Sequence, residues 1–268
     1  MLKSLRIDGC EKLIEKINNA SMPMLESILI GDWTNIKSIM QLGNFIYLTE
    51  LYIYICPHIE SFSDIELPVL TCLEIVECER MESMSAVLMT NLTLLKQLRI
   101  SDCPSIDASC HGRVWPPNLC SLEIGRLKKP MSECGPQNFP TSLVKLDLSH
   151  EPDVRNFSQL SHIFPSSLTE LWIGYIDNLE SFSMGLQHLT SLQDLTIENC
   201  PKLKHLPKHL TSLQHLTIRS CPKMKHLPKQ LFPLLLSFEI YGCLILRKRC
   251  KGRGPHYYPL ISHIPTSA

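Results

Sequence analysis

One apolar sequence motif, Leu-x-x-Leu-x-Ile, recurs eleven times along this chain, and in most copies a cysteine follows three residues later. Six copies are clear, and their first leucines are Leu2, Leu48, Leu70, Leu95, Leu192 and Leu213. Five weaker copies begin at Leu25, Leu119, Leu143, Leu168 and Leu235. Successive copies start 21 to 25 residues apart, so any fold of this chain has to repeat with that period.

The motif has a physical reason. The fourth and sixth places of each copy are apolar and their neighbours are mostly polar, which is the period of a short strand with one buried face. A single strand cannot bury that face alone, but stacked copies join their apolar columns into one core under a parallel sheet. The period and the motif predict a leucine-rich-repeat solenoid of the α/β class with about eleven repeats. We expect a curved parallel β-sheet on the concave face and an irregular or short helical convex side.

Each copy continues with a second apolar pair and often a proline, as in Leu203, Leu206 and Pro207. Because proline has no amide hydrogen, we expect it to end strand pairing and turn the chain along the convex side. The repeats predict one elongated leucine-rich-repeat domain over residues 1–246, and residues 247–268 are expected to form a closing segment.

Composition bounds the class of protein. With 268 residues and 44% apolar content, the chain is long enough for a large core. No run reaches the roughly 18 apolar residues that a membrane helix needs. Residues 1–20 already form a repeat that charged side chains interrupt, so we expect no secretory leader and a cytoplasmic or nuclear location.

The cysteines follow the repeat. Seven of the twelve share the ninth place of a copy, and these are Cys10, Cys56, Cys78, Cys103, Cys200, Cys221 and Cys243. A buried thiol there acts as a small apolar group with a weak hydrogen-bond donor. Neighbouring thiols about 4.8 Å apart are near disulfide distance, but a reducing compartment favours a structural ladder of free thiols, which we expect.

The formal net charge of zero conceals an imbalance. Residues 1–199 carry 14 Lys and Arg against 25 Asp and Glu, whereas residues 200–268 carry 12 against 1. Many of the basic residues, such as Lys204 and Lys225, lie outside the expected strands. They form either a solvated face or a contact with an acidic partner. Nucleic acid is disfavoured, because no aromatic residues are interleaved with these lysines.

The sequence offers no foothold for catalysis. It contains no phosphate-binding glycine loop, no His-Glu-x-x-His and no Cys-x-x-Cys. The strongest metal candidates are Cys200, His205, His209, His215, Cys221 and His226. However, His205 and His226 are one repeat position written twice, and a convex turn explains both. We expect no enzyme, no metal site and no cofactor in this chain.

Two segments carry a family resemblance. Residues 200–207, Cys-Pro-Lys-Leu-Lys-His-Leu-Pro, and their near copy at 221–228 resemble the C-terminal repeats of plant intracellular nucleotide-binding leucine-rich-repeat immune receptors of the coiled-coil class. Near the end of the chain, Arg-Lys-Arg-Cys at 247–250 and Ile-Ser-His-Ile-Pro at 261–265 resemble the segment that closes those receptors. Leu244 departs from the family's usual proline, and Tyr257 or Tyr258 from its usual tryptophan.

The resemblance implies a non-catalytic recognition and autoregulatory region of a disease-resistance receptor. Its partner would be a pathogen effector, a guarded host protein or the receptor's own nucleotide-binding domain. ADP or ATP would bind only to that domain, which nothing in this chain matches, so we expect a fragment or a truncated product. Two alternatives are a substrate adaptor of a ubiquitin ligase, which would need an upstream F-box, and an extracellular receptor ectodomain, whose paired capping cysteines are missing.

Candidate binding residues follow from the strand geometry. The third, fifth and seventh places of each repeat point away from the core, onto the concave face. Exposed aromatic residues there are candidate binding anchors, although aromatic residues also favour strands intrinsically. The predicted partner-binding residues are Tyr52, Tyr54, Arg99, Glu123, Asp147, Trp172, Asp194, Glu198, His215, Arg219, Glu239 and Tyr241.

A recent duplication sharpens this hypothesis. Residues 188–208 and 209–229 match at 17 of 21 places, and the four differences are Asp194/His215, Glu198/Arg219, Asn199/Ser220 and Leu203/Met224. The first two pairs occupy concave-face places and both lose or reverse a negative charge, whereas the convex lysines are unchanged. This pattern favours a concave recognition face that varies.

Overall fold

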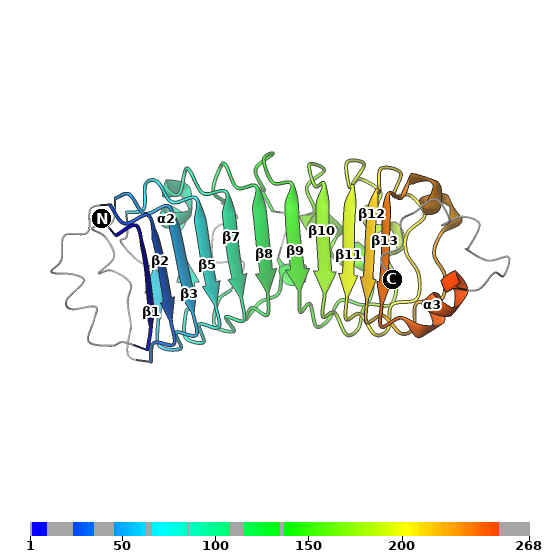
Figure 1. Ribbon diagram of the computed structural model, residues 1–268, viewed down its shortest axis with the longest axis horizontal. Helices are drawn as coiled ribbons and strands as arrows, with labels where there is room; N and C mark the ends of the chain where they lie inside the picture. Colours follow the sequence, from blue (N-terminus) through cyan, green and yellow to red (C-terminus); the bar gives the residue numbers. More distant parts are fainter. Residues whose placement is uncertain are drawn as a thin grey trace. The chain divides into compact units, whose positions relative to one another are not determined.

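The computed structural model of the protein describes residues 2–9, 24–34, 46–62, 66–84, 86–107, 115–134 and 137–251. It divides into two compact units, Met1–Leu143 and Val144–Ala268, and each is taken by itself. Within each unit, five-residue strands, drawn as arrows in Figure 1, lie parallel to one another. Each strand occupies the third to seventh places of one repeat, so the predicted strand positions are confirmed.

The first unit contains six of these strands. They are β1 (Ser4–Asp8), β2 (Ser27–Gly31), β3 (Glu50–Tyr54), β5 (Cys72–Val76), β7 (Gln97–Ser101) and β8 (Ser121–Gly125), hydrogen-bonded in that order. The connections between them are short or irregular. They include the small pair β4 (Ser61–Phe62) and β6 (Ser83–Met84), the helix α2 (Ala86–Asn91) and the 3-10 turn η2 (Met131–Glu133).

The second unit contains the other five strands. They are β9 (Lys145–Ser149), β10 (Glu170–Gly174), β11 (Asp194–Glu198), β12 (His215–Arg219) and β13 (Ser237–Tyr241). Their connections hold 3-10 turns rather than regular helices, which are η3 (Phe157–Gln159), η4 (Ser161–Ile163), η5 (Ser183–Leu186) and η6 (Lys229–Leu234). Helix α3 (Leu244–Lys251) follows β13 and packs beside it. The predicted irregular or short helical convex side is therefore confirmed.

The core has the predicted columns. In β3, Leu51 and Ile53 are fully buried while the residues between and around them are half-buried, and β11 repeats the same alternation. The irregular repeats of the second unit add an aromatic cluster that the repeat pattern did not predict. Phe157 packs against Phe164 and Phe182 with ring centroids 5.0 and 4.5 Å apart, and Gly185 leaves room for the Phe157 backbone.

Each of the eleven main strands is followed by a left-handed turn. The eighth place of all eleven repeats has a positive φ, from Gly9 at 63° to Gly242 at 67°, and includes Ile55 at 55° and Tyr175 at 55°. The reason is a backbone contact: the amide at this place donates to the carbonyl of the seventh place on the next strand, as Ile55 N does to Val76 O at 3.0 Å. Pairing with the next repeat, rather than the residue's own preference, sets this conformation.

The cysteine ladder is present in the described part of the chain. Six ninth-place cysteines are buried and unbridged, namely Cys56, Cys78, Cys103, Cys200, Cys221 and Cys243, and Cys10 lies outside the described residues. Each thiol contacts the backbone carbonyl two residues before it, as Cys56 Sγ does with Tyr54 O at 3.3 Å. Because it is buried, the pKa of Cys56 is raised to about 12. The ladder is structural, as predicted.

The predicted closing segment, residues 247–268, can be followed only as far as residue 251. Its first part belongs to α3, where Arg249 Nη1 lies 2.6 Å from Nδ1 of His226. The residues that carry the remainder of the resemblance, Tyr257, Tyr258 and 261–265, lie outside the described residues.

Candidate concave recognition face

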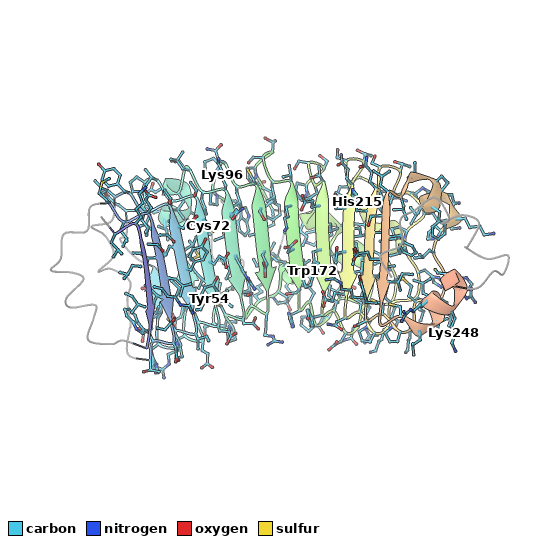
Figure 2. All side chains as sticks on the ribbon, viewed as in Figure 1. Tyr54, Cys72, Lys96, Trp172, His215 and Lys248 are labelled. Atoms are coloured by element: carbon cyan, nitrogen blue, oxygen red, sulfur yellow. The ribbon has the colours of Figure 1, made fainter. Side chains whose placement is uncertain are left out.

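The predicted binding residues occupy the concave-face places of both units. Ten of the twelve are half-buried, and Arg219 and Tyr241 are exposed. In Figure 2, Tyr54, Trp172 and His215 lie over the strands, whereas Lys248 lies on α3. Half-burial is what a sheet surface with long side chains produces, because neighbouring strands shield the stem of each side chain and leave its end free.

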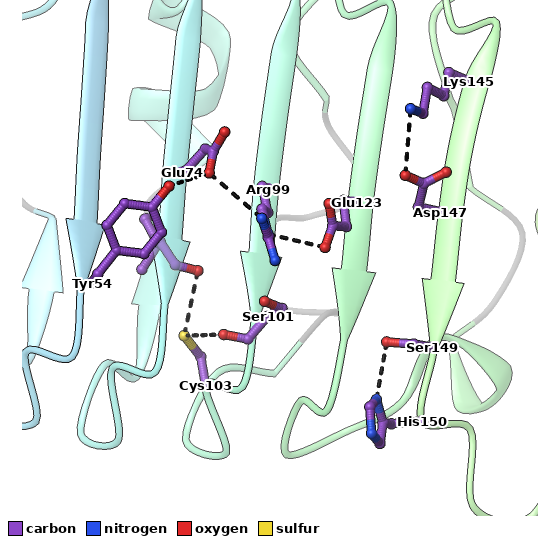
Figure 3. A network of polar contacts seen from close by, with 11 residues as sticks. Tyr54, Glu74, Arg99, Ser101, Cys103, Glu123, Lys145, Asp147, Ser149 and His150 are labelled. Carbon is purple, nitrogen blue, oxygen red and sulfur yellow. Dashed lines mark hydrogen bonds and ion pairs between the residues drawn. The ribbon is translucent and has the colours of Figure 1, made fainter. Parts of the chain in front are cut away.

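In the first unit, four of the residues form one network with a fifth that was not predicted. The Tyr54 hydroxyl donates to Glu74, Arg99 Nη1 lies 3.8 Å from Glu74 Oε2, and Arg99 Nε lies 2.9 Å from Glu123 Oε1 (Figure 3). Tyr52 stacks on Tyr54 with ring centroids 6.4 Å apart. The network spans β3, β5, β7 and β8, so it joins side chains that are distant in the sequence.

Glu74 is the residue that sequence reasoning missed. It occupies the fifth place of β5, in register with Tyr52 on one side and Arg99 on the other. The alternation of charge along this row, Glu74, Arg99 and Glu123, was the available signal. Burial, and then the bond to Glu74, raises the pKa of the Tyr54 hydroxyl, which therefore remains a hydrogen-bond donor at neutral pH.

In the second unit, the side chain of Trp172 packs along its own strand, β10, over Gly174. A Cβ at Gly174 would come 2.3 Å from Cη2 of the indole, so the ring occupies the space that a side chain at that place would fill. Tyr175 lies 6.1 Å from Trp172 by ring centroids and stacks on His150 at 5.0 Å. Neither Gly174 nor Tyr175 was predicted as part of the site. The glycine at an outward strand position was the signal for a close approach.

The duplicated repeats place their differing residues side by side, as predicted. Asp194 is opposite His215, and Glu198 is opposite Arg219, in the register of β11 and β12. Arg219, however, is not directed at Glu198. Its Nη2 lies 3.9 Å from Glu239 Oε2 and its Cζ lies 5.6 Å from the Tyr241 ring centroid, so it joins the two predicted residues of β13.

Asp147, the remaining predicted residue, is the cross-strand neighbour of Trp172 and forms an ion pair with Lys145 at 3.7 Å. The metal candidates are dispersed. Cys200 and Cys221 belong to the buried ladder, while the rings of His205 and His226 stack 6.4 Å apart in a convex bridge. Within the described residues, no group of three or more His, Cys, Asp or Glu could hold a metal ion.

Of the helices that the structure describes, none combines the length and the apolarity that crossing a membrane would need. What the concave face offers is a row of aromatic rings and charged groups held on rigid strands. Such a surface can bind a complementary protein segment.

Comparison with known proteins supports the fold. No family model matches the chain, and no curated protein matches it. The solved structure of InlP from Listeria monocytogenes has a TM-score of 0.53 and 15% identity over 89% of this chain and 62% of InlP. The chain therefore spans less than two thirds of that protein.

Two further structures are similar. An internalin, InlF, from Listeria monocytogenes has a TM-score of 0.49 and 19% identity over 90% of this chain and 74% of InlF. Toll in the Drosophila Toll–Spatzle complex has a TM-score of 0.49 and 12% identity over 90% of this chain and 36% of its own. These neighbours are leucine-rich-repeat proteins, and the likeness extends to the fold alone.

Proposed function

From the leucine-rich-repeat solenoid fold, we propose that the chain is the recognition and autoregulatory region of a plant intracellular nucleotide-binding leucine-rich-repeat immune receptor, and that it acts without catalysis. Its concave face binds a protein, which is a pathogen effector, a guarded host protein or the receptor's own nucleotide-binding domain.

One observation carries this proposal: the two duplicated repeats keep the same scaffold and differ on the concave face. The register places Asp194 beside His215 and Glu198 beside Arg219, while the cysteines and the convex lysines are the same in both copies. The core differs at one place, where buried Leu203 is replaced by buried Met224. Substitutions that alter charge on one face and spare the scaffold alter what the face binds rather than how it folds. The sequence likeness of residues 200–207 and 221–228 to the receptor family supports the particular class.

The first test is to express the tagged chain in leaf cells and label the proteins in its vicinity. The comparison is between the wild type, a concave double variant, Tyr54→Ala with Trp172→Ala, and a convex double variant, Lys204→Glu with Lys225→Glu. We expect a set of proteins that the concave variant loses and the convex variant keeps. Identical sets from the wild type and the concave variant, at equal abundance, would contradict recognition by this face.

The receptor class is tested separately, by reading the genomic sequence upstream of the Met1 codon. A nucleotide-binding module in frame with the repeats is expected. An F-box in that place would instead support a substrate adaptor of a ubiquitin ligase, and the concave face would then select the substrate.

A further inference from the structure

The face of β10 and β11 around Trp172 carries three carboxylates that form no ion pair in the described part of the chain. Glu170 and Asp194 are direct cross-strand neighbours, and Glu198 is opposite Gly174. Among the residues that the structure describes, none pairs with the side chain of Glu170, Asp194 or Glu198. Two like charges opposite each other on neighbouring strands destabilise the pair, so this arrangement favours a cation from outside.

The nearest cations of the second unit are engaged elsewhere. Lys145, the cross-strand neighbour of Glu170, pairs with Asp147 at 3.7 Å. Arg219, the cross-strand neighbour of Glu198, is directed at Glu239 and at the ring of Tyr241 on β13. The register also places His215 opposite Asp194, so each of the three carboxylates has one basic cross-strand neighbour. Among the described residues, none of these three neighbours forms an ion pair with the carboxylate opposite it.

Trp172 supplies the other half of a cation site. Its indole rests over Gly174, is half-buried, and lies on the same face of β10 and β11 as the three carboxylates. The face of an indole attracts a guanidinium or an ammonium group, and tryptophan does so more strongly than the other aromatic residues.

The first unit shows how this surface holds a guanidinium. Arg99 lies with its Nε 2.9 Å from Glu123 and its Nη1 3.8 Å from Glu74, carboxylates of the strands on either side of its own. The Tyr54 hydroxyl, which donates to Glu74, completes that group (Figure 3). Around Trp172 the carboxylates and the aromatic ring are present, and in the described part of the chain no cation pairs with Glu170, Asp194 or Glu198.

We infer that the patch of Glu170, Trp172, Asp194 and Glu198 binds a lysine or arginine side chain presented by a protein partner. This inference rests on the proposed function, because it names the chemistry that the concave face selects. The occupant is a segment with at least one basic residue, and charge complementarity with the three carboxylates is what identifies it.

The binding test selects peptides from a random library displayed on phage. The wild-type chain is compared with Trp172→Ala, with Asp194→Asn plus Glu198→Gln, and with Glu60→Gln plus Glu82→Gln, a control of equal charge change at two exposed glutamates outside the eleven main strands. Circular dichroism and thermal unfolding confirm that each variant is folded. We expect the wild type and the control to enrich peptides with lysine or arginine.

Synthetic peptides from that selection should bind about two- to fivefold more weakly for each carboxylate removed, and about tenfold or more weakly to Trp172→Ala. Enrichment that depends on Trp172 but lacks basic residues would overturn this inference and leave recognition by the concave face standing. If no enrichment depends on concave-face residues, both proposals fail.

A second measurement needs no partner. Trp33 and Trp115 are 1% and 5% exposed, so an ionic quencher acts mainly on Trp172. The local negative charge should make caesium a better quencher, and iodide a poorer one, than for a free tryptophan amide. The quenching constant of caesium divided by that of iodide should fall by about twofold or more in Asp194→Asn plus Glu198→Gln. An unchanged ratio would mean that the carboxylates exert no field at the indole, and would overturn the inference.

Discussion

Replacing Gly174 by alanine should displace the Trp172 indole while leaving the strand intact. The new Cβ would lie 2.3 Å from Cη2 and 2.6 Å from Cζ2 of the ring, too close for any real contact. Gly174 has no positive φ, so alanine fits the strand backbone there. The indole is the part that has to move, because the backbone of β10 is hydrogen-bonded to β9 and β11.

Two opposing effects set the magnitude. Alanine is favoured over glycine in a strand by roughly 0.5 to 1 kcal/mol. A displaced indole that loses about a third of a tryptophan's roughly 200 Å² of burial would lose about 1.6 kcal/mol at about 25 cal/mol per Å². The net effect is a destabilisation of about 0.5 to 1 kcal/mol. In a Trp172→Thr background, the same Gly174→Ala change should instead stabilise by about 0.5 to 1 kcal/mol.

The assay is urea unfolding of the four proteins of this double-mutant cycle, together with acrylamide quenching of tryptophan fluorescence. A coupling of about 1.5 kcal/mol between residues 172 and 174 is expected. Acrylamide quenching should rise in Gly174→Ala because the displaced Trp172 indole becomes more exposed. The rise reports on Trp172, because Trp33 and Trp115 are buried. Equal effects of Gly174→Ala in both backgrounds, with unchanged quenching, would refute the packing of Trp172 on Gly174.

Three further predictions concern the scaffold and the face. Because burial raises the pKa of Cys56 to about 12, its thiol is protonated at pH 8. Cys56 should therefore alkylate far more slowly than partly exposed Cys120, with a rate that rises toward pH 12. Equal alkylation rates for the two cysteines in peptide mapping would contradict this. Gly242→Ala should cost about 1 to 2 kcal/mol in urea unfolding, because φ is +67° and Ser220 Cα lies 3.2 Å from the new Cβ. Exchanging Asp194→His with His215→Asp should change stability by no more than about 0.5 kcal/mol. Under the proposed immune-receptor function, the same exchange should alter effector-dependent cell death at normal abundance in a full-length receptor.

The eleven main strands could be predicted because the fourth and sixth places of each repeat are apolar. In β3, Leu51 and Ile53 are buried and their neighbours are half-buried, and β9 and β11 show the same alternation. The left-handed turns could not be predicted in the same way. Gly9 and Asn199 favour a positive φ, but Ile55 and Tyr175 oppose it, and they adopt it because the next strand takes their amide as a donor. A contact between repeats overrides a local preference there.

For the candidate site, the sequence predicts neighbours but not pairs. The repeat places Arg219 directly opposite Glu198 on β11 and Tyr241 on β13. Glu239, which is opposite Thr217, is a diagonal neighbour, so Arg219 has two carboxylates, Glu198 and Glu239, near it. The side-chain rotamer decides between them, and it favours Glu239 together with the ring of Tyr241. The same limit applies to Trp172. Its indole lies over Gly174, and the repeat motif does not specify a glycine at that place.

The scaffold is built in a way that lets the concave face vary. Strand pairing uses backbone groups, and the turn after each strand is held by an amide that every non-proline residue possesses. The eighth place accordingly accepts Asn199 in one duplicated repeat and Ser220 in the next, with φ of 47° and 52°. The thiols of Cys200 and Cys221 contact the main-chain carbonyls two residues before them. A change from Asp194 to the histidine of the following repeat therefore removes no bond on which the fold depends, and its effect is on whatever the face binds.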